Sequence, residues 1–302
     1  MQSFINTIPL AVRYMIFSAF GFAVMGMCVK LVGQDGIPVL EIVAARSLVS
    51  LILSYASIRQ KRLAMFGCRK DLLIARGVVG ALTLVCVYYS VTTLPLAEAT
   101  VLQYLHPTFT AILAVIFLKE RLHSSVIVCI ILSSIGLVVI AQPAFLFGGS
   151  QQTFSYFSIS IALLGAFGSA VAYVLVRKLT ETDDPAVIII YFPLIALPFS
   201  LLLLGNDFVM PTWEQAGLLI LVGVFTQAGQ LGLTKAMQTE TASKATAFSY
   251  LQIIFSAVLG WLVFSEIPVF WTWVGGGLIV TGALINMFAK QRIAEKVVAT
   301  KK

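Results

Sequence analysis

Apolar runs of about 20 residues recur along almost the whole chain of 302 residues. A helix of that length crosses the roughly 30 Å hydrocarbon core of a membrane. The runs are continuous and do not alternate between apolar and polar residues, so they predict membrane-spanning helices and not the strands of a β-barrel. We predict ten spans, at about residues 12–32, 38–58, 71–92, 97–119, 123–141, 156–179, 186–205, 212–236, 242–265 and 268–289.

The placement of charge supports this topology. Charged residues make up 11% of the chain, against about 25% in soluble proteins, which excludes a soluble domain. The net charge of +7 does not indicate a nucleic-acid partner, because the basic residues lie in short loops, where they orient a chain in the membrane. If both termini are cytoplasmic, eighteen of the twenty Lys and Arg residues, Arg76 included, fall at or near the inner face, and only Lys30 and Arg46 do not. The short loops and the absence of an N-x-S/T site favour a bacterial inner membrane.

One stretch occurs twice. Residues 99–120 align without a gap to residues 245–266, with eight identities in twenty-two positions, where composition alone gives roughly two. The identical pairs are Ala99/Ala245, Thr100/Thr246, Tyr104/Tyr250, Leu105/Leu251, Phe109/Phe255, Ala111/Ala257, Leu113/Leu259 and Glu120/Glu266. This match predicts an internal repeat, the alternative being two helices that are alike only because membrane helices share a composition.

The repeat divides the chain into two units of five helices. We predict repeat 1 at 12–141, an uncharged Gly/Ser/Gln-rich connection at 142–155, repeat 2 at 156–289, and a basic cytoplasmic tail at 290–302. Because each unit has an odd number of spans, the two units insert in opposite orientations. Inverted repeats of this kind are a transporter architecture in which the substrate site lies near the membrane midplane.

The sequence also resembles a known family. Two tandem five-helix units, the run Leu-Pro-Leu-Ala-Glu-Ala-Thr at 94–100 and an apolar helix that ends in Leu-Lys-Glu-Arg-Leu at 118–122 are similar to the EamA family of the drug/metabolite transporter superfamily. The resemblance covers about 12–289. It implies an all-α bundle of ten helices that carries small polar metabolites through a central cavity lined by the fourth and ninth helices, with the fifth and tenth as an outer scaffold.

Charges inside the spans are the first candidates for a substrate site, since each costs about 2.5–3.5 kcal/mol at a helix centre. Arg46 lies eight residues into its span, about 12 Å deep. It either faces the cavity and binds a substrate carboxylate, or forms an ion pair with Glu98 or Glu41. Glu41 lies five residues from Arg46 and about 140° around the same helix, so these two are poor partners for each other. Lys30 and Glu98 both fall near the outer face, so Glu41, Lys30 and Glu98 are candidates for ion pairing or coupling.

Polar residues at equivalent depths in the two repeats are a second set of candidates. Gln103 and His106 are three residues apart and would share one face of the fourth span, and their repeat equivalents Ser249 and Gln252 would share a face of the ninth. These side chains either line the cavity or form hydrogen bonds between helices. His106 could in addition couple transport to protons, although a single histidine more often has a fixed hydrogen-bond partner.

The third and eighth spans differ in their polar residues. Tyr88 and Tyr89 lie in the third, and Gln227 and Gln230 in the eighth, which predicts an aromatic wall of the cavity opposite an amide wall. The tyrosines could equally belong to the interfacial belt, and only one of two adjacent residues can face the cavity.

Other features have structural interpretations. Glu120 and Glu266 would lie at opposite faces and cap helix N-termini or bridge to basic residues. Pro107 would kink the fourth span near its middle. Gly275–Gly277 would form a scaffold contact or a homodimer contact.

The sequence favours a secondary transporter over the other function classes. It contains no H-E-x-x-H, no paired catalytic carboxylates and no nucleophile with a base, so we predict no enzyme activity, no cofactor and no metal ion. It also lacks the repeated filter of a channel. We predict export of a small polar organic metabolite, such as an amino acid or amino-acid derivative. The alternatives are uptake or exchange of S-adenosylmethionine or an organic carboxylate, opine-type compounds included, and, more remotely, a non-transport role.

Overall fold

The computed structural model describes the backbone of residues 8–94, 96–142 and 155–299 and, except at 88, 92, 96–98 and 290–299, their side chains. The described part is entirely helical, and ten of its helical segments are long and apolar enough to cross a membrane. The helices are α2 (Leu10–Gln34), α3 (Val39–Gln60), α4 (Lys70–Thr93), α5 (Leu96–Gln103), α6 (His106–Leu118), α7 (Ser124–Ala141), α9 (Tyr156–Leu179), α10 (Pro185–Leu204), α11 (Trp213–Thr239), α12 (Ala242–Ala247), η1 (Phe248–Tyr250), α13 (Leu251–Phe264) and α14 (Phe270–Ala299).

The predicted spans agree with these helices in position. Their ends differ by three residues or fewer, with one exception at the C-terminus. There α14 continues as a helix through 290–299, the segment that the sequence predicted to be a tail. The fourth and ninth spans are each broken into shorter helices, α5 with α6 and α12 with η1 and α13.

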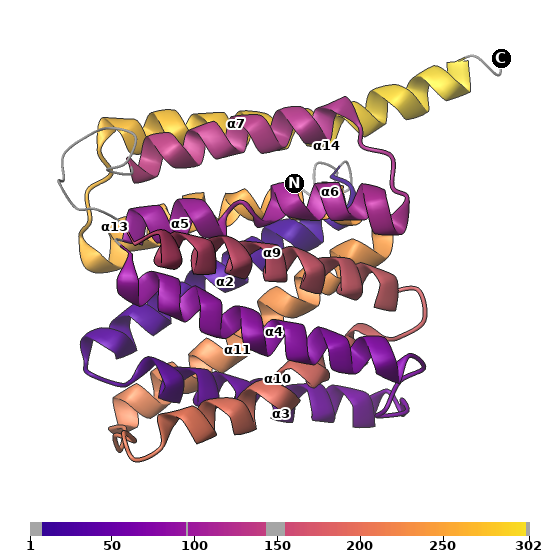
Figure 1. Cartoon of the computed structure of the whole chain (residues 1–302). Helices are drawn as coiled ribbons and strands as arrows, with labels where there is room; N and C mark the ends of the chain where they lie inside the picture. The colour runs from indigo at the N-terminus through magenta and orange to yellow at the C-terminus, as the bar shows by residue number, and fades with distance from the viewer. Residues whose placement is uncertain (1–7, 95, 143–154, 300–302) are drawn as a thin grey trace.

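Helices of the first half of the chain pack against helices of the second half (Figure 1). The first span contacts the eighth (α2 with α11), the third contacts the sixth (α4 with α9), and the second contacts the seventh (α3 with α10). Exchanging the two repeats maps these pairs onto each other, as expected of two related five-helix units. The fifth and tenth spans (α7 and α14) pair with each other at one edge of the bundle, which agrees with the scaffold position expected from the family resemblance.

Glycines permit the closest helix approaches. A Cβ on Gly232 of α11 would lie 2.7 Å from the carbonyl oxygen of Tyr14 in α2, and a Cβ on Gly275 of α14 would lie 2.4 Å from the carbonyl oxygen of Gly136 in α7. Gly275 therefore makes the scaffold contact that the sequence predicted. A Cβ on Gly276 would meet no atom within 4 Å.

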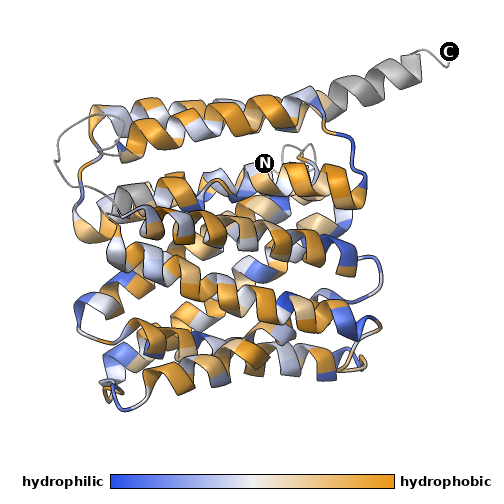
Figure 2. Cartoon of the chain, viewed as in Figure 1, coloured by the Kyte–Doolittle hydropathy of each residue, from blue (hydrophilic) through white to orange (hydrophobic). Residues whose placement is uncertain are grey.

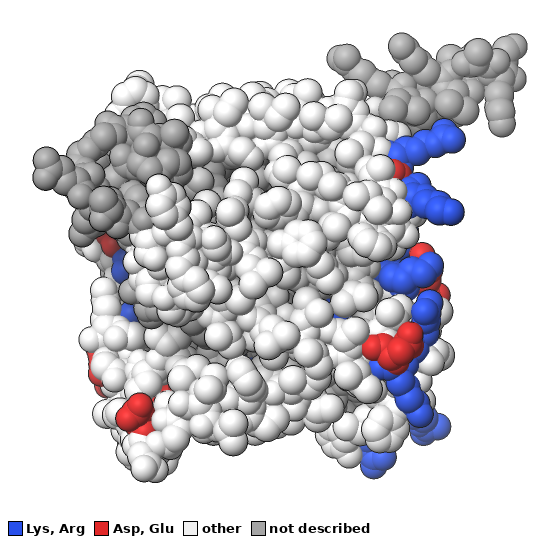
Figure 3. Space-filling view, in the orientation of Figure 1, with Lys and Arg blue, Asp and Glu red and all other residues white. Residues whose placement is uncertain are grey.

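The surface is apolar around the middle of the bundle and charged at its ends. Hydrophobic residues cover the outward faces of the helices, as a lipid environment requires (Figure 2). In Figure 3, Lys and Arg side chains gather at one end. We call this the basic end; α3, α6, α9 and α11 end there, and α4 and α10 begin there. The other end, where α2, α4, α10 and α13 end, is the opposite end.

The fourth and ninth spans, whose last helices are α6 and α13, end in the same way. Lys119 and Ser265, which are equivalent in the repeat, both adopt left-handed backbone conformations with φ of 53° and 56°. The backbone amides of the following residues, Glu120 and Glu266, each donate a hydrogen bond to the carbonyl six residues earlier, at 3.1 and 3.2 Å. The same local geometry thus places one glutamate at the basic end and its counterpart at the opposite end.

Candidate functional site

The breaks in the fourth and ninth spans meet inside the bundle. In the fourth span the helix is interrupted at Tyr104 and Leu105, and it resumes as α6 with Pro107 in its first turn. Proline is tolerated there because backbone N–H groups in the first turn have no partner within the helix. The Tyr250 hydroxyl, from the break in the ninth span, donates a hydrogen bond of 2.8 Å to the carbonyl oxygen of Tyr104. Their ring centroids lie 5.6 Å apart. Tyr104 and Tyr250 are equivalent in the repeat, so the pseudo-twofold axis passes between them.

The break corrects one expectation of the sequence analysis. Gln103 is the last residue of α5 and His106 is the first of α6, so the two side chains do not share a face of one continuous helix. The interruption lies just before Pro107, near the middle of the span where the sequence predicted a kink, and it is the reason why the spacing argument fails here.

His106 lies in a row of aromatic side chains. Its ring centroid is 5.8 Å from that of Tyr104 and 5.2 Å from that of Tyr173 in α9, with the latter pair edge to face. The side chain is buried, and within the described part of the chain its Nδ1 atom has no hydrogen-bond partner. The row thus joins the break in the fourth span to α9.

Two arginines lie against one phenylalanine ring. The guanidinium carbons of Arg46 in α3 and Arg76 in α4 each lie 5.5 Å from the ring centroid of Phe192 in α10. Within the described side chains neither arginine forms an ion pair or a hydrogen bond, and the Nε atom of each is buried without a partner.

Sequence reasoning missed Arg76 because it counted this residue with the inner-face cations. Arg76 is only 5% exposed and lies within the bundle. Its guanidinium folds back over its own helix at Gly80, where a Cβ would lie 2.6 Å from Nη1 of Arg76 and 2.7 Å from Cδ2 of Phe192. The signal in the sequence was a glycine four residues after the arginine, on the same helix face.

Two of the candidate amides form hydrogen bonds between helices. Gln103 Nε2 donates to Ser169 Oγ in α9 at 3.1 Å, and Gln227 Nε2 donates to Ser54 Oγ in α3 at 2.8 Å. The Gln227 Oε1 atom is buried without a partner among the described residues. The interhelical role that the sequence analysis left open is therefore present for both glutamines, and contact with substrate stays a prediction.

The remaining polar candidates are half-buried in the second repeat. Ser249 in η1 donates to the carbonyl oxygen of Thr246 in the preceding α12 at 2.7 Å. Gln230 and Gln252 have intermediate exposure. Their roles as substrate ligands stay predictions.

The tyrosines of the third span were expected to point in different directions. Tyr89 is 38% exposed and packs edge to face on Phe157 of α9, with the ring centroids 5.8 Å apart. The side chain of Tyr88 lies outside the described residues, so the predicted aromatic wall stays untested.

The ion pairs near the opposite end differ from those expected. Lys30 pairs with Glu266 and also lies over the ring of Phe264, with Nζ 4.2 Å from the centroid. The link between Lys30 and Glu266 joins α2 of the first repeat to the end of α13 in the second. Glu266 thus bridges to a basic residue, as the sequence predicted.

Glu41 does not pair with Arg46 among the described contacts, as their spacing on one helix led us to expect. Glu41 is buried, and its Oε2 atom accepts a hydrogen bond of 3.0 Å from the backbone amide of Val209 in the connection between α10 and α11. The physical reason is the spacing on α3: the two side chains project from different sides of the helix. The alternative partner, Glu98, has a side chain outside the described residues.

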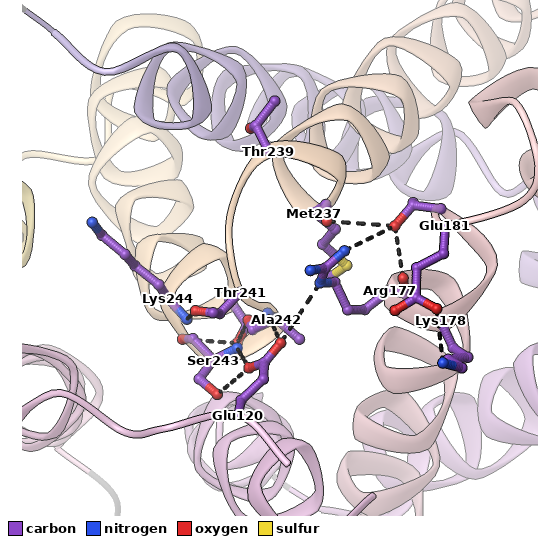
Figure 4. A network of polar contacts seen from close by, with 12 residues as sticks. Glu120, Arg177, Lys178, Glu181, Met237, Thr239, Thr241, Ala242, Ser243 and Lys244 are labelled. Atoms are coloured by element: carbon purple, nitrogen blue, oxygen red, sulfur yellow. Dashed lines mark hydrogen bonds and ion pairs between the residues drawn. The ribbon is translucent and has the colours of Figure 1, made fainter. Parts of the chain in front are cut away.

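Glu120 forms a denser cluster at the basic end (Figure 4). One carboxylate oxygen accepts a hydrogen bond of 2.8 Å from the amide of Ala242. The other accepts from the amide of Ser243 at 3.3 Å and from its hydroxyl at 2.9 Å. The Nε atom of Arg177 in α9 lies 3.6 Å from Glu120, whose side chain is 8% exposed. Glu120 therefore caps α12, as predicted, and links the end of the fourth span to the start of the ninth.

Comparison with known proteins agrees with this architecture. The sequence model of the EamA-like transporter family matches the chain twice, at residues 9–142 and 156–288. The chain belongs to this family. It is a multi-pass membrane protein and a small-molecule transporter of the EamA type, not an enzyme.

Individual relatives are also transporters. The chain is 34% identical over 270 residues to the pseudopaline exporter CntI of Pseudomonas aeruginosa, covering 89% of this chain and 93% of that protein. It is 32% identical over 295 residues to solute carrier family 35 member G1 of Mus musculus, covering 92% and 78%. A crystal structure of another protein has the same fold, with a TM-score of 0.80 over 94% of this chain and 98% of that chain at 16% sequence identity.

Proposed function

We propose that this EamA transporter exports a small organic metabolite that bears a carboxylate, such as an amino acid or amino-acid derivative, across the cytoplasmic membrane. The observation that carries the proposal is Arg46. A guanidinium has five N–H donors and a permanent charge. Here it lies within a span, and no described side chain pairs with its charge. An anionic group of a substrate would supply the missing partner.

We propose export as the direction of transport because the name of the bacterial relative describes an exporter. We propose a carrier mechanism because the fourth and ninth spans are broken. Discontinuous helices at the midplane are the elements around which transporters of the inverted-repeat type alternate between their two open states. The clusters of Glu120 and Glu266 lie at the two ends of those spans, where such states would close and open. We propose that the basic end faces the cytoplasm, because positive charge favours that side.

The test is counterflow in proteoliposomes with labelled amino acids, amines, S-adenosylmethionine and dicarboxylates, with and without a pH gradient. We expect exchange of carboxylate-bearing compounds. Arg46→Gln should reduce this exchange at least tenfold, and Gln252→Ala should also abolish transport. Arg59→Gln is the matched control, because Arg59 is an exposed residue of the same helix.

The outcomes separate the alternatives. If amines exchange and carboxylates do not, or if Arg46→Gln exchanges like the parent, the carboxylate proposal is wrong. Exchange of S-adenosylmethionine alone would favour the alternative carrier. Direction is measured in cells loaded with the labelled substrate: an exporter accelerates the loss of label, whereas an uptake carrier accelerates its entry.

A further inference from the structure

We infer that Arg76 is a second anion-binding residue, and that Arg46 and Arg76 together, on either side of the substrate and beside Phe192, select compounds that carry two acidic groups. This inference rests on the proposed function and narrows its substrate class. It adds a residue and a charge requirement to the site.

Two positive charges lie near Phe192, and no described carboxylate compensates them. Each guanidinium carbon lies 5.5 Å from the same ring centroid, so the two carbons lie within twice that distance of each other. Two like charges this close repel each other in a poorly solvated interior. Within the described part of the chain no carboxylate pairs with either of them. One acidic group would neutralise one arginine and leave the other uncompensated.

Other cations of this protein offer a comparison. Arg177, which is partly buried at the basic end, lies beside Glu120, and Lys61 lies 2.9 Å from Asp184. Each of these two basic side chains therefore has a carboxylate partner. Arg76 is 5% exposed, more deeply buried than either of these cations, and its guanidinium lies against the ring of Phe192 and against Gly80 of its own helix.

Both arginines make a cation–π contact with Phe192. A cation–π contact recovers less free energy than the burial of a charge at the centre of a span costs. Phe192 alone therefore does not offset the burial of two guanidiniums. The ring does hold them in place, and Gly80 provides the space in which the Arg76 guanidinium lies. The arrangement keeps N–H donors of both arginines available to a bound anion.

The experiment uses the full-length transporter in detergent and compares dicarboxylates with their monoamides. The probes are malonate, succinate and glutarate, each beside the compound in which one carboxylate is a carboxamide. We expect at least one dicarboxylate to raise the melting temperature of the parent more than its monoamide does. Arg76→Gln should abolish that difference and leave the response to the monoamide unchanged. Arg59→Gln should keep the parental pattern.

Counterflow supplies the second readout. For a substrate class found to exchange, we expect the parent to prefer the diacid over its monoamide at least tenfold in kcat/KM. Arg76→Gln should reduce that preference to about onefold by raising the KM of the diacid alone. Arg76→Lys keeps the positive charge but loses the planar guanidinium that can donate two hydrogen bonds to one carboxylate. This variant should retain part of the preference for the diacid over its monoamide. A purely structural role for Arg76 would instead lower exchange of both compounds equally.

The inference and the proposed function fail in different ways. If monocarboxylates exchange as well as diacids, and Arg46→Gln abolishes both, the carboxylate carrier stands and the two-arginine site is overturned. The same holds if Arg76→Gln keeps the preference for diacids, or if no dicarboxylate in the series stabilises the parent more than its monoamide. If no carboxylate exchanges or stabilises the protein, both are overturned.

Discussion

Removing the Glu120 carboxylate should open the basic end. In the structure it accepts two hydrogen bonds from backbone amides of α12 and one from the Ser243 hydroxyl, and its side chain is 8% exposed. Hydrogen bonds to a charged group contribute about 1.5–3 kcal/mol each and are not additive. We therefore expect Glu120→Ala to shift the free energy between the closed and open basic end by about 2–4 kcal/mol. That shift is roughly 30- to 1000-fold in the equilibrium constant.

Hydrogen exchange at single amides measures this shift directly. The amides of Ala242 and Ser243 are bonded to Glu120 in the closed state and exchange when the cluster opens. Their exchange rates should rise by roughly 30- to 1000-fold in Glu120→Ala. The matched control is Glu266→Ala, the repeat equivalent. The Glu266 side chain is 58% exposed and that of its partner Lys30 is 41% exposed, so the pair contributes about 0–1 kcal/mol.

The reasoning would be refuted by equal effects of the two substitutions, or by unchanged exchange at both amides in Glu120→Ala. A uniform rise in exchange along α12 and α13, beyond the first turn of α12, would also count against it. Such a result would indicate that Glu120 stabilises the whole span and does not hold one end closed.

Three further substitutions test the packing, each by the melting temperature in detergent. Gly275→Ala should destabilise the protein by about 1–3 kcal/mol, because the new Cβ would lie 2.4 Å from a backbone oxygen of α7. The control Gly276→Ala, whose new Cβ would meet no atom within 4 Å, should stay within about 1 kcal/mol of the parent. Equal melting temperatures of the two variants would contradict this expectation. Ser54→Ala leaves the buried amide of Gln227 without its bond and should cost about 1–3 kcal/mol, so a parental melting temperature would argue that water replaces the hydroxyl. Tyr250→Phe removes the hydroxyl that joins the two broken spans and should cost about 1 kcal/mol; no change would show that ring packing alone holds the breaks together.

The helices could be predicted because the membrane leaves few alternatives. Every backbone polar group in hydrocarbon must be bonded within its own segment, so long apolar runs must be helical, and their ends fall close to the last apolar residue. The break at Tyr104 and Leu105 was harder to predict from the sequence. Pro107 indicated it, but where a helix stops and restarts depends on the neighbouring helix, here through Tyr250. The length of α14 was missed because a polar sequence can still continue a helix.

The candidate site could be predicted only in part, because it too depends on contacts between helices. Arg46 could be singled out, because its depth follows from counting residues along one helix. Arg76 could not, since its burial depends on Gly80 and on Phe192 from another helix. Which partner a polar side chain takes is set by tertiary contacts: the spacing on α3 made Arg46 a poor partner for Glu41, but it did not indicate that Glu41 accepts a hydrogen bond from the loop amide of Val209.

The contact between Tyr104 and Tyr250 has a consequence for the origin of the fold. In a protein made of two equivalent units, a residue that lies on the symmetry axis meets its own counterpart. A single five-helix gene whose product inserted in both orientations would have placed two copies of one tyrosine against each other at this point. Such a contact needs no second sequence. In this chain the two tyrosines have different roles, since Tyr250 donates its hydroxyl and Tyr104 contributes its carbonyl.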